Sequence, residues 1–320
     1  MIGEAKTTAV SWLKALRTVQ AARRGENPLR SALRTYRWLR HFPQQRRWLA
    51  HVETCDILRE AAMADPRLHD RWHRAYISRQ FDADARLRIV DAHYTFLTQH
   101  FPRRMRERIV RGHDLRVATL RLENGLPAYL HLRKPADDGA GELGIYLLNA
   151  YKEVLASCVI TFAGSEGLLI GSLRGAWPYM AEEATREFVR GSCGLKPKDL
   201  LLSLLRALAV SYGIESIRAV SGHAQLRRNG DSDTFLQAHG GVLTEAGCYD
   251  MPLYDLSHPQ ASSQRRRAMD ARREDFRREA CDLFLQAFQG YRPRTSAPLH
   301  NAKATDTRPS LALGVMAASA

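Results

Sequence analysis

A helix that is apolar on nearly every side constrains the fold of this chain most strongly. Pro197 suits a first helical position and Gly213 suits a left-handed C-terminal cap, which bounds the helix at residues 197–212. Ala207 and Ala209 fill in between the larger apolar residues of this helix, which are Leu200, Leu201, Leu202, Leu204, Leu205, Leu208 and Val210. Apolar side chains around most of the circumference predict a buried helix. Because apolar runs flank it on both sides, we expect a crossover between two strands of one sheet.

Short apolar segments with turn residues between them come before this helix. They are residues 116–123, 127–133, 142–149, 152–163 and 167–175, and their short connections predict an antiparallel meander. The segment 214–221 is expected to return to the same sheet, and residues 242–256 to form a final strand pair or an extended segment. Residues 221–241 read as a polar loop region. The sequence therefore predicts an α+β fold whose mixed, mainly antiparallel sheet carries a buried crossover helix.

Helical periodicity dominates the N-terminal part of the chain. Residues 6–24 predict a basic amphipathic helix, and residues 29–50 predict a helix that Pro43 interrupts. Aromatic residues alternate there with arginines, a pattern typical of rings packed inward or of rings that stack on nucleobases: Tyr36, Trp38, Phe42 and Trp48. Residues 65–101 predict two or three short helices. His93 and His100 share one face, as a weak metal pair or as hydrogen-bonded core residues.

The change of pattern along the chain predicts four regions. Residues 1–112 form a helical region with a basic arm, and residues 113–260 form the α/β core. Residues 261–290 predict an exposed, ion-paired helix because charges of both signs recur at helical spacing. Residues 291–320, rich in Pro, Ser, Thr and Ala, predict a disordered tail.

Charge favours an anionic partner. The formal net charge is +14, and residues 1–50 hold eleven basic and two acidic residues. Such a surface suits anionic lipid, nucleic acid or an acidic protein, although it also fits a solvated basic face. No apolar run is long enough to span a membrane, and the N-terminus lacks a secretory pattern, so we expect a cytoplasmic protein, peripheral on the inner membrane if the arm binds lipid.

The start of the apolar helix is the best candidate for binding an anion. Lys196 and Lys198 flank Pro197, where a helix already presents free N–H groups and a partial positive charge. A phosphate would relieve this arrangement, with Gly194 in the preceding loop. Internal carboxylates could do the same, and the candidates are Asp199, Glu182, Glu183 and Glu187.

Polar residues also follow the two strands that this helix connects. Arg174 follows the first, and His223 follows the second, with Asp233 further on. Ligands of open sheets bind at this edge. Imidazole titrates near neutral pH, so His223 is a candidate general base or acid. It could equally cap the strand by hydrogen bonding, and Asp233 could orient it or act as the N-cap of a segment beginning at Thr234.

Several well-known motifs are missing. The chain contains no GxxxxGK[ST] loop, no GxGxxG directly after a predicted strand, no HExxH and no GxSxG. These absences disfavour ATP hydrolysis, Rossmann-type dinucleotide binding and zinc hydrolysis. The five cysteines are widely spaced, which fits neither a metal-ligand set nor a disulfide framework, so no metal is expected.

A set of motifs from Asp65 to Gln289 resembles the VirK/YbjX family of bacterial proteins. The first motif is DPRL…YI…R…HY.FL, carried by Pro66, Leu68, Tyr76, Ile77, Arg86, His93, Tyr94 and Phe96. The others are IGSLRG at 170–175, T…GLKPKDLLL at Thr185 and 194–202, the turn around His223, and the pair Gly240–Gly241. The family is one of unknown function, and the resemblance implies an association with the bacterial envelope and with virulence.

The order of elements is also similar to the acyl-CoA-dependent N-acetyltransferase (GNAT) fold. In that fold the pantetheine and pyrophosphate of the donor dock at the start of a helix like residues 197–212. The loop 190–194 differs from the usual phosphate loop of that fold, and a likeness of fold does not assign a function.

Three hypotheses follow from these features. In the first, the chain transfers an acyl group from a CoA- or carrier-linked donor to an amine or hydroxyl of a peptide or lipid. Lys196, Lys198, Gly194 and Arg174 would hold the donor, and His223 or Glu183 would take the acceptor's proton, with Asp233 in support. In the second, the chain is a non-catalytic protein that binds a membrane surface or a partner. In the third, the basic arm binds nucleic acid.

Overall fold

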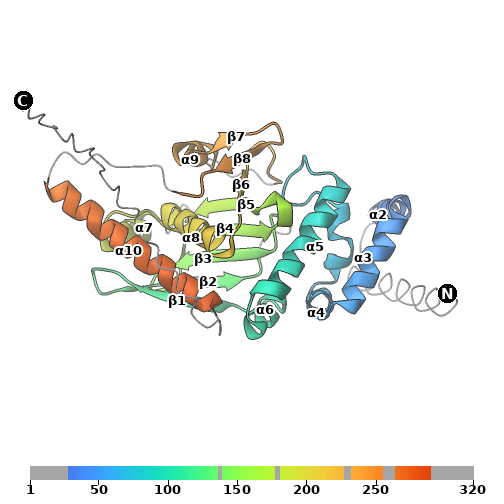
Figure 1. The fold of residues 1–320 in the computed structure, drawn as a ribbon, viewed down its shortest axis with the longest axis horizontal. Helices are drawn as coiled ribbons and strands as arrows, with labels where there is room; N and C mark the ends of the chain where they lie inside the picture. Colours follow the sequence, from blue (N-terminus) through green and yellow to red (C-terminus); the bar gives the residue numbers. More distant parts are fainter. Residues whose placement is uncertain (1–27, 136–138, 177–180, 227–231, 255–263, 290–320) are drawn as a thin grey trace, which may run out of the picture. The chain divides into compact units, whose positions relative to one another are not determined.

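The computed structural model describes residues 28–135, 139–176, 181–226, 232–254 and 264–289. The predicted helix at 6–24 and the predicted tail after Gly290 lie outside these residues. Within the described part, helices surround one 8-stranded sheet (Figure 1), which confirms the α+β class. The four predicted regions remain a prediction.

The sheet has the order β1-β2-β3-β4-β5-β6-β8-β7. Its strands are β1 (Leu115–Arg121), β2 (Pro127–Arg133), β3 (Leu143–Leu148), β4 (Val154–Phe162), β5 (Leu168–Gly175), β6 (Ile217–Val220), β7 (Val242–Leu243) and β8 (Cys248–Met251). Strands β1 to β5 form the predicted antiparallel meander. Strand β6 lies parallel to β5, and β8 and β7 continue the sheet antiparallel. The mixed, mainly antiparallel sheet and the returning strand are therefore confirmed.

The predicted crossover helix is α8 (Pro197–Tyr212), which lies against β3, β4 and β5 (Figure 1). Pro197 occupies its first turn, and Gly213 ends it in the left-handed conformation with φ +66°. Its leucines are at most 1% exposed, so each contributes about 1.5–3 kcal/mol of burial. The prediction was wrong at Val210, which is 41% exposed because it lies on the outer side of the last turn.

The N-terminal helical region precedes the sheet. Its helices are α2 (Pro28–Arg40), α3 (Phe42–Thr54), α4 (Asp56–Ala64), the 3₁₀ helix η1 (Pro66–His73), α5 (Ala83–His100) and α6 (Arg103–Val110). Pro43 lies in the first turn of α3, which confirms the break that it was expected to cause. The prediction of two or three short helices over residues 65–101 was correct in number, with η1 and α5, but wrong in length, because α5 has 18 residues.

The aromatic residues of the first two helices divide between two environments. Trp38 and Trp48 are buried at 4% and 3% exposure, as inward packing predicts. Tyr36 and Phe42 instead face outward, at 59% and 42% exposure. On each of α2 and α3, one aromatic side chain faces the rest of the protein and the other faces solvent.

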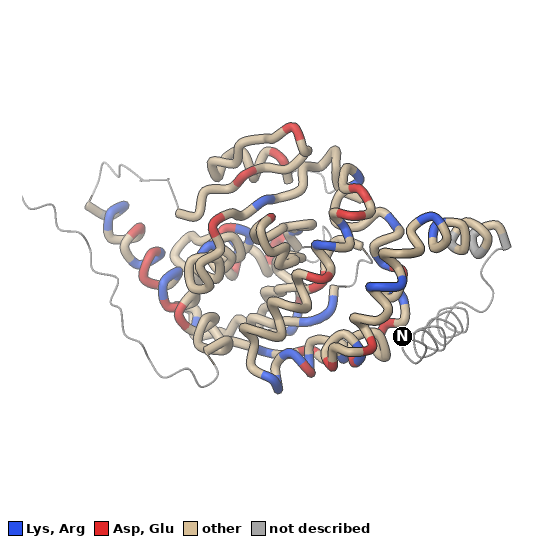
Figure 2. Tube along the Cα trace, turned by 45° about the vertical axis from the view of Figure 1, so that its right-hand side comes forward, with Lys and Arg blue, Asp and Glu red and all other residues tan. Residues whose placement is uncertain are grey.

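Three further helices complete the described fold: α7 (Ala181–Gly191), α9 (Ser232–Ala238) and α10 (Gln264–Phe288). Helix α9 interrupts the region that reads as a polar loop, and the buried side chain of Leu236 fixes its inner face. Figure 2 shows charges of both signs along α10. Arg277 pairs there with Glu274, and Arg278 pairs with Asp275. The prediction of an exposed, ion-paired helix is correct for the charged residues 274–278. It is wrong for the apolar side of α10, since Phe284 is buried and α10 packs against α8 and β1.

Candidate functional site

The turn that carries His223 is held rigidly at the end of β6. The backbone N–H groups of Ala224 and Gln225 donate to the Ser221 carbonyl at 3.0 and 2.9 Å. The turn is also fixed from outside, because Arg79 N donates to the Ala224 carbonyl at 2.9 Å and Ser78 forms an isolated bridge with Gln225. His223 itself is exposed at the tip. An imidazole is therefore presented to solvent on a fixed support.

Asp233 supports this turn through the backbone rather than through the imidazole. Its Oδ1 accepts the backbone N–H of Gly222 at 2.7 Å. A Cβ at Gly222 would lie 3.1 Å from Asp233 Oδ2, so glycine allows this close approach. The expected N-cap role is wrong, because α9 already begins at Ser232. Asp233 positions the turn on which His223 lies.

The start of α8 meets the end of β5 at the same edge. Lys196 is the exposed N-cap residue and makes no side-chain cap, while Lys198 is half-buried. Lys198 Nζ lies 5.5 Å from the centre of the Phe235 ring on α9, a cation–π distance. A Cβ at Gly175 would lie 3.3 Å from Lys198 Cε. The lysine therefore connects α8, α9 and the last residue of β5.

Asp199 supplies a carboxylate in the first turn of α8, as the alternative to a bound phosphate requires. Its Oδ1 lies 3.3 Å from Nε2 of His239. The hydrogen bond to Asp199 raises the pKa of His239 above its usual value, although burial opposes this shift. Asp199 is thus paired with His239, the residue after α9, whereas Lys196 is exposed.

The remaining predicted residues lie on the elements around this edge. Arg174 is the half-buried penultimate residue of β5, opposite Ser157 of β4. Gly194 is exposed at φ +89°, and its N–H donates to the Val189 carbonyl at 2.7 Å to end α7. Glycine is favoured there by backbone conformation. Glu183 is exposed in the first turn of α7. Contacts connect Lys198, Asp233 and the His223 turn through β5 and α9, and the roles of all these residues stay predictions.

Strands β5 and β6 separate toward this edge. Their parallel pairing runs from Leu168 with Ile217 to Ile170 with Ala219. Strand β5 continues to Gly175, whereas the chain after Val220 turns away toward His223. The described ends of the two strands thus diverge beside the start of α8, a place where sheets bind ligands.

A buried charged network on the other side of the His223 turn was missed by the sequence reasoning. Arg71 Nη1 donates to both carboxylate oxygens of Glu142 at 2.6 Å, and Arg71 Nη2 donates to Asp65 at 2.5 Å. The hydroxyl groups of Tyr76 and Tyr94 donate to Glu142 at 2.8 and 3.0 Å. Four of these five residues, all except Glu142, lie in or between the DPRL, YI and HY motifs. The position of these residues within the motifs was the sequence signal that could have pointed to the network.

The Arg71 guanidinium decides the charge state of this network. Burial alone would raise the pKa of Glu142, but Arg71, followed by His93 and the Tyr76 hydroxyl, holds it below its usual value. Burial raises the pKa of Tyr76 and of Tyr94 well above the usual value, so both phenols stay protonated as donors. The carboxylate is fully paired, which is typical of a structural ion pair rather than a reactive acid.

Ile77 links this network to the His223 turn. It lies in the left-handed region at φ 60°, which is rare for a β-branched residue. Its N–H donates to the Gly139 carbonyl at 2.6 Å, and its neighbours Tyr76 and Ser78 contact Glu142 and Gln225. Such a conformation persists where the surroundings fix it from several sides. The network and the turn thus form one connected structure.

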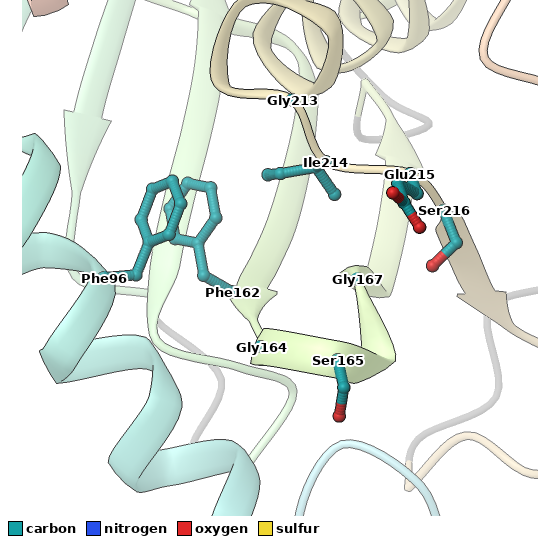
Figure 3. A pocket seen from close by; sticks show the side chains of 9 residues that line it. All are labelled: Phe96, Phe162, Gly164, Ser165, Gly167, Gly213, Ile214, Glu215 and Ser216. Atoms are coloured by element: carbon teal, nitrogen blue, oxygen red, sulfur yellow. The ribbon is translucent and has the colours of Figure 1, made fainter.

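A pocket of about 510 Å³ opens at the opposite end of β5 and β6. Its lining consists of Phe96, Phe162, Gly164, Ser165, Gly167, Gly213, Ile214, Glu215 and Ser216. Figure 3 shows Ile214 pointing toward the rings of Phe96 and Phe162, which stack at 3.9 Å. None of the predicted site residues lines this pocket.

Metal binding and membrane spanning find no support in the described residues. Those residues contain no group of three His, Cys, Asp or Glu side chains that could hold a metal ion. Of the predicted histidine pair, His93 is a core residue whose Nδ1 lies 3.2 Å from the backbone N of Phe162. No helix in the described ranges is both long enough and apolar enough to cross a bilayer.

Comparisons with known proteins agree with the motifs. A family model described as "Protein of unknown function (DUF535)" matches residues 29–277. The chain is also 24% identical over 220 residues to "Uncharacterized protein YbjX" of Escherichia coli (strain K12). That alignment covers 64% of this chain and 67% of the relative. The family match includes both the edge that carries His223 and the buried network.

Proposed function

The chain belongs to the DUF535 family of proteins of unknown function, as its motifs indicated, and we propose that it binds a phosphate-bearing acyl donor where β5 and β6 diverge. The observation that carries this proposal is the exposed Lys196 and the half-buried Lys198 beside that divergence. The first N–H groups of α8 and the two ammonium groups would bind the donor's phosphates. The donor is an acyl-CoA or a carrier-linked acyl group.

The order of elements supports this assignment. Strand β5 is followed by α7, α8 and the parallel strand β6, and then by α9 and an antiparallel strand. The acetyltransferase fold similarly has a meander, a helix whose start holds the donor's pyrophosphate, and a returning strand, although its phosphate loop directly follows the strand and no helix like α7 intervenes. The similarity to the acetyltransferase fold concerns topology only, and topology does not assign a reaction. The proposed acyl transfer is therefore argued from the residues near the ends of β5 and β6.

In the proposed reaction an amine or hydroxyl of the acceptor attacks the donor's thioester carbonyl. The new N–C or O–C bond forms as the C–S bond breaks, and the thiol leaves with a proton. His223 would take the acceptor's proton, with Glu183 as the alternative base, and Arg174 would orient a carboxylate or phosphate. An acceptor on a lipid or peptide of the envelope would account for the virulence and envelope association that the family resemblance implies.

A melting experiment tests donor binding without requiring an acceptor. Acetyl-coenzyme A at about 100 times its dissociation constant should stabilise the full chain by about 2.7 kcal/mol. The double variant Lys196→Ala/Lys198→Ala should lose most of this shift, because each charge-assisted hydrogen bond contributes about 1.5 kcal/mol or more. Arg104→Ala removes one exposed positive charge from α6 and serves as the control. No shift for the natural chain, or equal shifts for all three proteins, would refute the proposal.

A further inference from the structure

Helix α2 presents an apolar stripe to solvent. Leu29, Leu33, Tyr36 and Leu39 are 77%, 49%, 59% and 62% exposed. At about 100° per residue these four positions fall within about 120° of the helix circumference. Four large apolar side chains on one side of a 13-residue helix form an exposed apolar patch, which is typical of an interaction site for a protein or a membrane. We name these four residues the α2 stripe.

The opposite side of α2 attaches the helix to the protein. Trp38, about 180° from Leu29 around the helix, is buried at 4% exposure and stacks with His73 of η1. Arg37 Nη1 donates to the His73 carbonyl at 3.4 Å, and α2 contacts both α3 and η1. Trp38 and Arg37 therefore contact the rest of the protein, while the four side chains of the α2 stripe remain 49–77% exposed.

Helix α2 also carries positive charge. Helix α2 contains four arginines and no acidic residue, as Figure 2 shows by the absence of red along it. Arg40 falls at about 20° from Leu29 around the helix, so it continues the line of the stripe by one turn. Arg46 and Arg47 are exposed on the next helix. Apolar residues next to arginines suit a surface that combines hydrocarbon with negative charge.

We propose that α2 lies in the plane of an anionic lipid bilayer, with the α2 stripe buried at the boundary between headgroups and acyl chains. A helix with leucine and tyrosine on one side and arginines beside them is typical of interfacial binding. Arg40, Arg46 and Arg47 would contact lipid phosphates, each contributing about 1 kcal/mol near such a surface. This surface is separate from the donor site, so either proposal can fail alone.

Charge complementarity favours lipid over the other occupants of this surface. Residues 1–27 are one candidate, but they carry five basic and two acidic residues, so their net charge has the same sign as that of α2. A second copy of the chain would bring the same positive helix. A bilayer supplies both the negative phosphates and the apolar layer that the α2 stripe requires.

Sedimentation with lipid vesicles tests the proposal on the full chain. Vesicles of phosphatidylcholine with phosphatidylglycerol should bind the protein, whereas phosphatidylcholine alone should bind it much more weakly. Leu33→Gln/Leu39→Gln keeps good helix formers and should lower partitioning by about tenfold or more. The control Met63→Gln/Tyr151→Gln changes two side chains that are 77% and 72% exposed elsewhere and should bind normally.

A second pair of variants tests the charged part. Arg40→Gln/Arg46→Gln/Arg47→Gln should weaken binding to the anionic vesicles, and the control Arg88→Gln/Arg104→Gln/Arg121→Gln should weaken it less. Unchanged melting temperatures establish that all variants are folded. Equal binding of the leucine variant and the natural chain would overturn the proposal, because attraction would then be electrostatic only. Binding that does not distinguish anionic from neutral vesicles would overturn it as well.

Discussion

Arg71 Nη1 lies 2.6 Å from both carboxylate oxygens of Glu142, although 71 residues separate the two in sequence. The pair joins η1 to the residue before β3, and both side chains are almost fully buried, at 11% and 3% exposure. Tyr76 and Tyr94 occupy further acceptor sites on the same carboxylate. The helical region is therefore attached to the sheet through a satisfied buried charge.

Glu142→Gln should destabilise the protein strongly. The change leaves the Arg71 guanidinium buried with Asp65 as its remaining carboxylate, and breaking one side of a buried pair costs about 3–5 kcal/mol. Removing both charges in Arg71→Met/Glu142→Leu should cost less than Glu142→Gln alone. The free energy of unfolding in urea is measured for both variants.

The exposed pair of Arg103 with Glu107 provides the comparison for this prediction. Glu107→Gln removes a carboxylate that faces solvent on α6, so unfolding should change little. If Glu142→Gln is as mild as Glu107→Gln, the network does not stabilise the attachment of the helices to the sheet.

His93 should make the fold sensitive to acid. Burial lowers the pKa of His93 to about 4, from 6.5. Between about pH 6.5 and pH 4, His93 is therefore protonated in the unfolded chain but neutral in the folded chain. The contribution of His93 to the free energy of unfolding is complete above pH 6.5 and decreases as the pH falls through this range. One such proton corresponds to about 1.4 kcal/mol per pH unit.

The variant His93→Asn separates this effect from other titrations. Its amide oxygen can accept the Phe162 N–H that Nδ1 now meets at 3.2 Å, but it cannot bind a proton in this range. Free energies of unfolding measured from pH 6.5 to 4 should fall less steeply for the variant than for the natural chain. Parallel slopes would contradict the prediction, whatever the offset between the two proteins.

Two glycines of β5 should respond differently to alanine. A Cβ at Gly171 would lie 1.8 Å from the Ala140 carbonyl oxygen, a backbone atom, so Gly171→Ala should unfold or strongly destabilise the sheet. A Cβ at Gly175 would lie 3.3 Å from Lys198 Cε, the flexible part of a side chain. Gly175→Ala should therefore keep its melting temperature within a few degrees and weaken donor binding by moving Lys198. Equal melting temperatures of the two variants would contradict this account.

The sheet and its crossover could be predicted because their signals are local. Pro197 and Gly213 bound α8 at both ends, and the predicted segment 127–133 matches β2 residue for residue. The order of β1 to β5 followed from short connections, which favour antiparallel neighbours. The exposure of Val210 could not be predicted, because a helix that is apolar on all sides gives no sign of which side of its last turn faces solvent.

The contacts of the buried network could not be predicted in the same way. Arg71 and Glu142 come together because η1 packs against α5, which lies against β4, and no local pattern fixes a contact between residues so far apart in sequence. Ile77 at φ 60° contradicts local preference, so only its surroundings explain it. Asp233 was a candidate either for orienting His223 or for capping a segment from Thr234, whereas its carboxylate accepts the backbone N–H of Gly222, a contact that no local pattern specifies.

Hydrogen exchange of the full chain with and without acetyl-coenzyme A tests the donor site most directly. The account predicts slower exchange of the backbone N–H groups at residues 194–200, where α8 begins, and at 221–225, the turn of His223. Lys196→Ala/Lys198→Ala should reduce this protection. Protection that is absent from both segments, or confined to the opposite pocket at residues 164–167 and 213–216, would contradict the account.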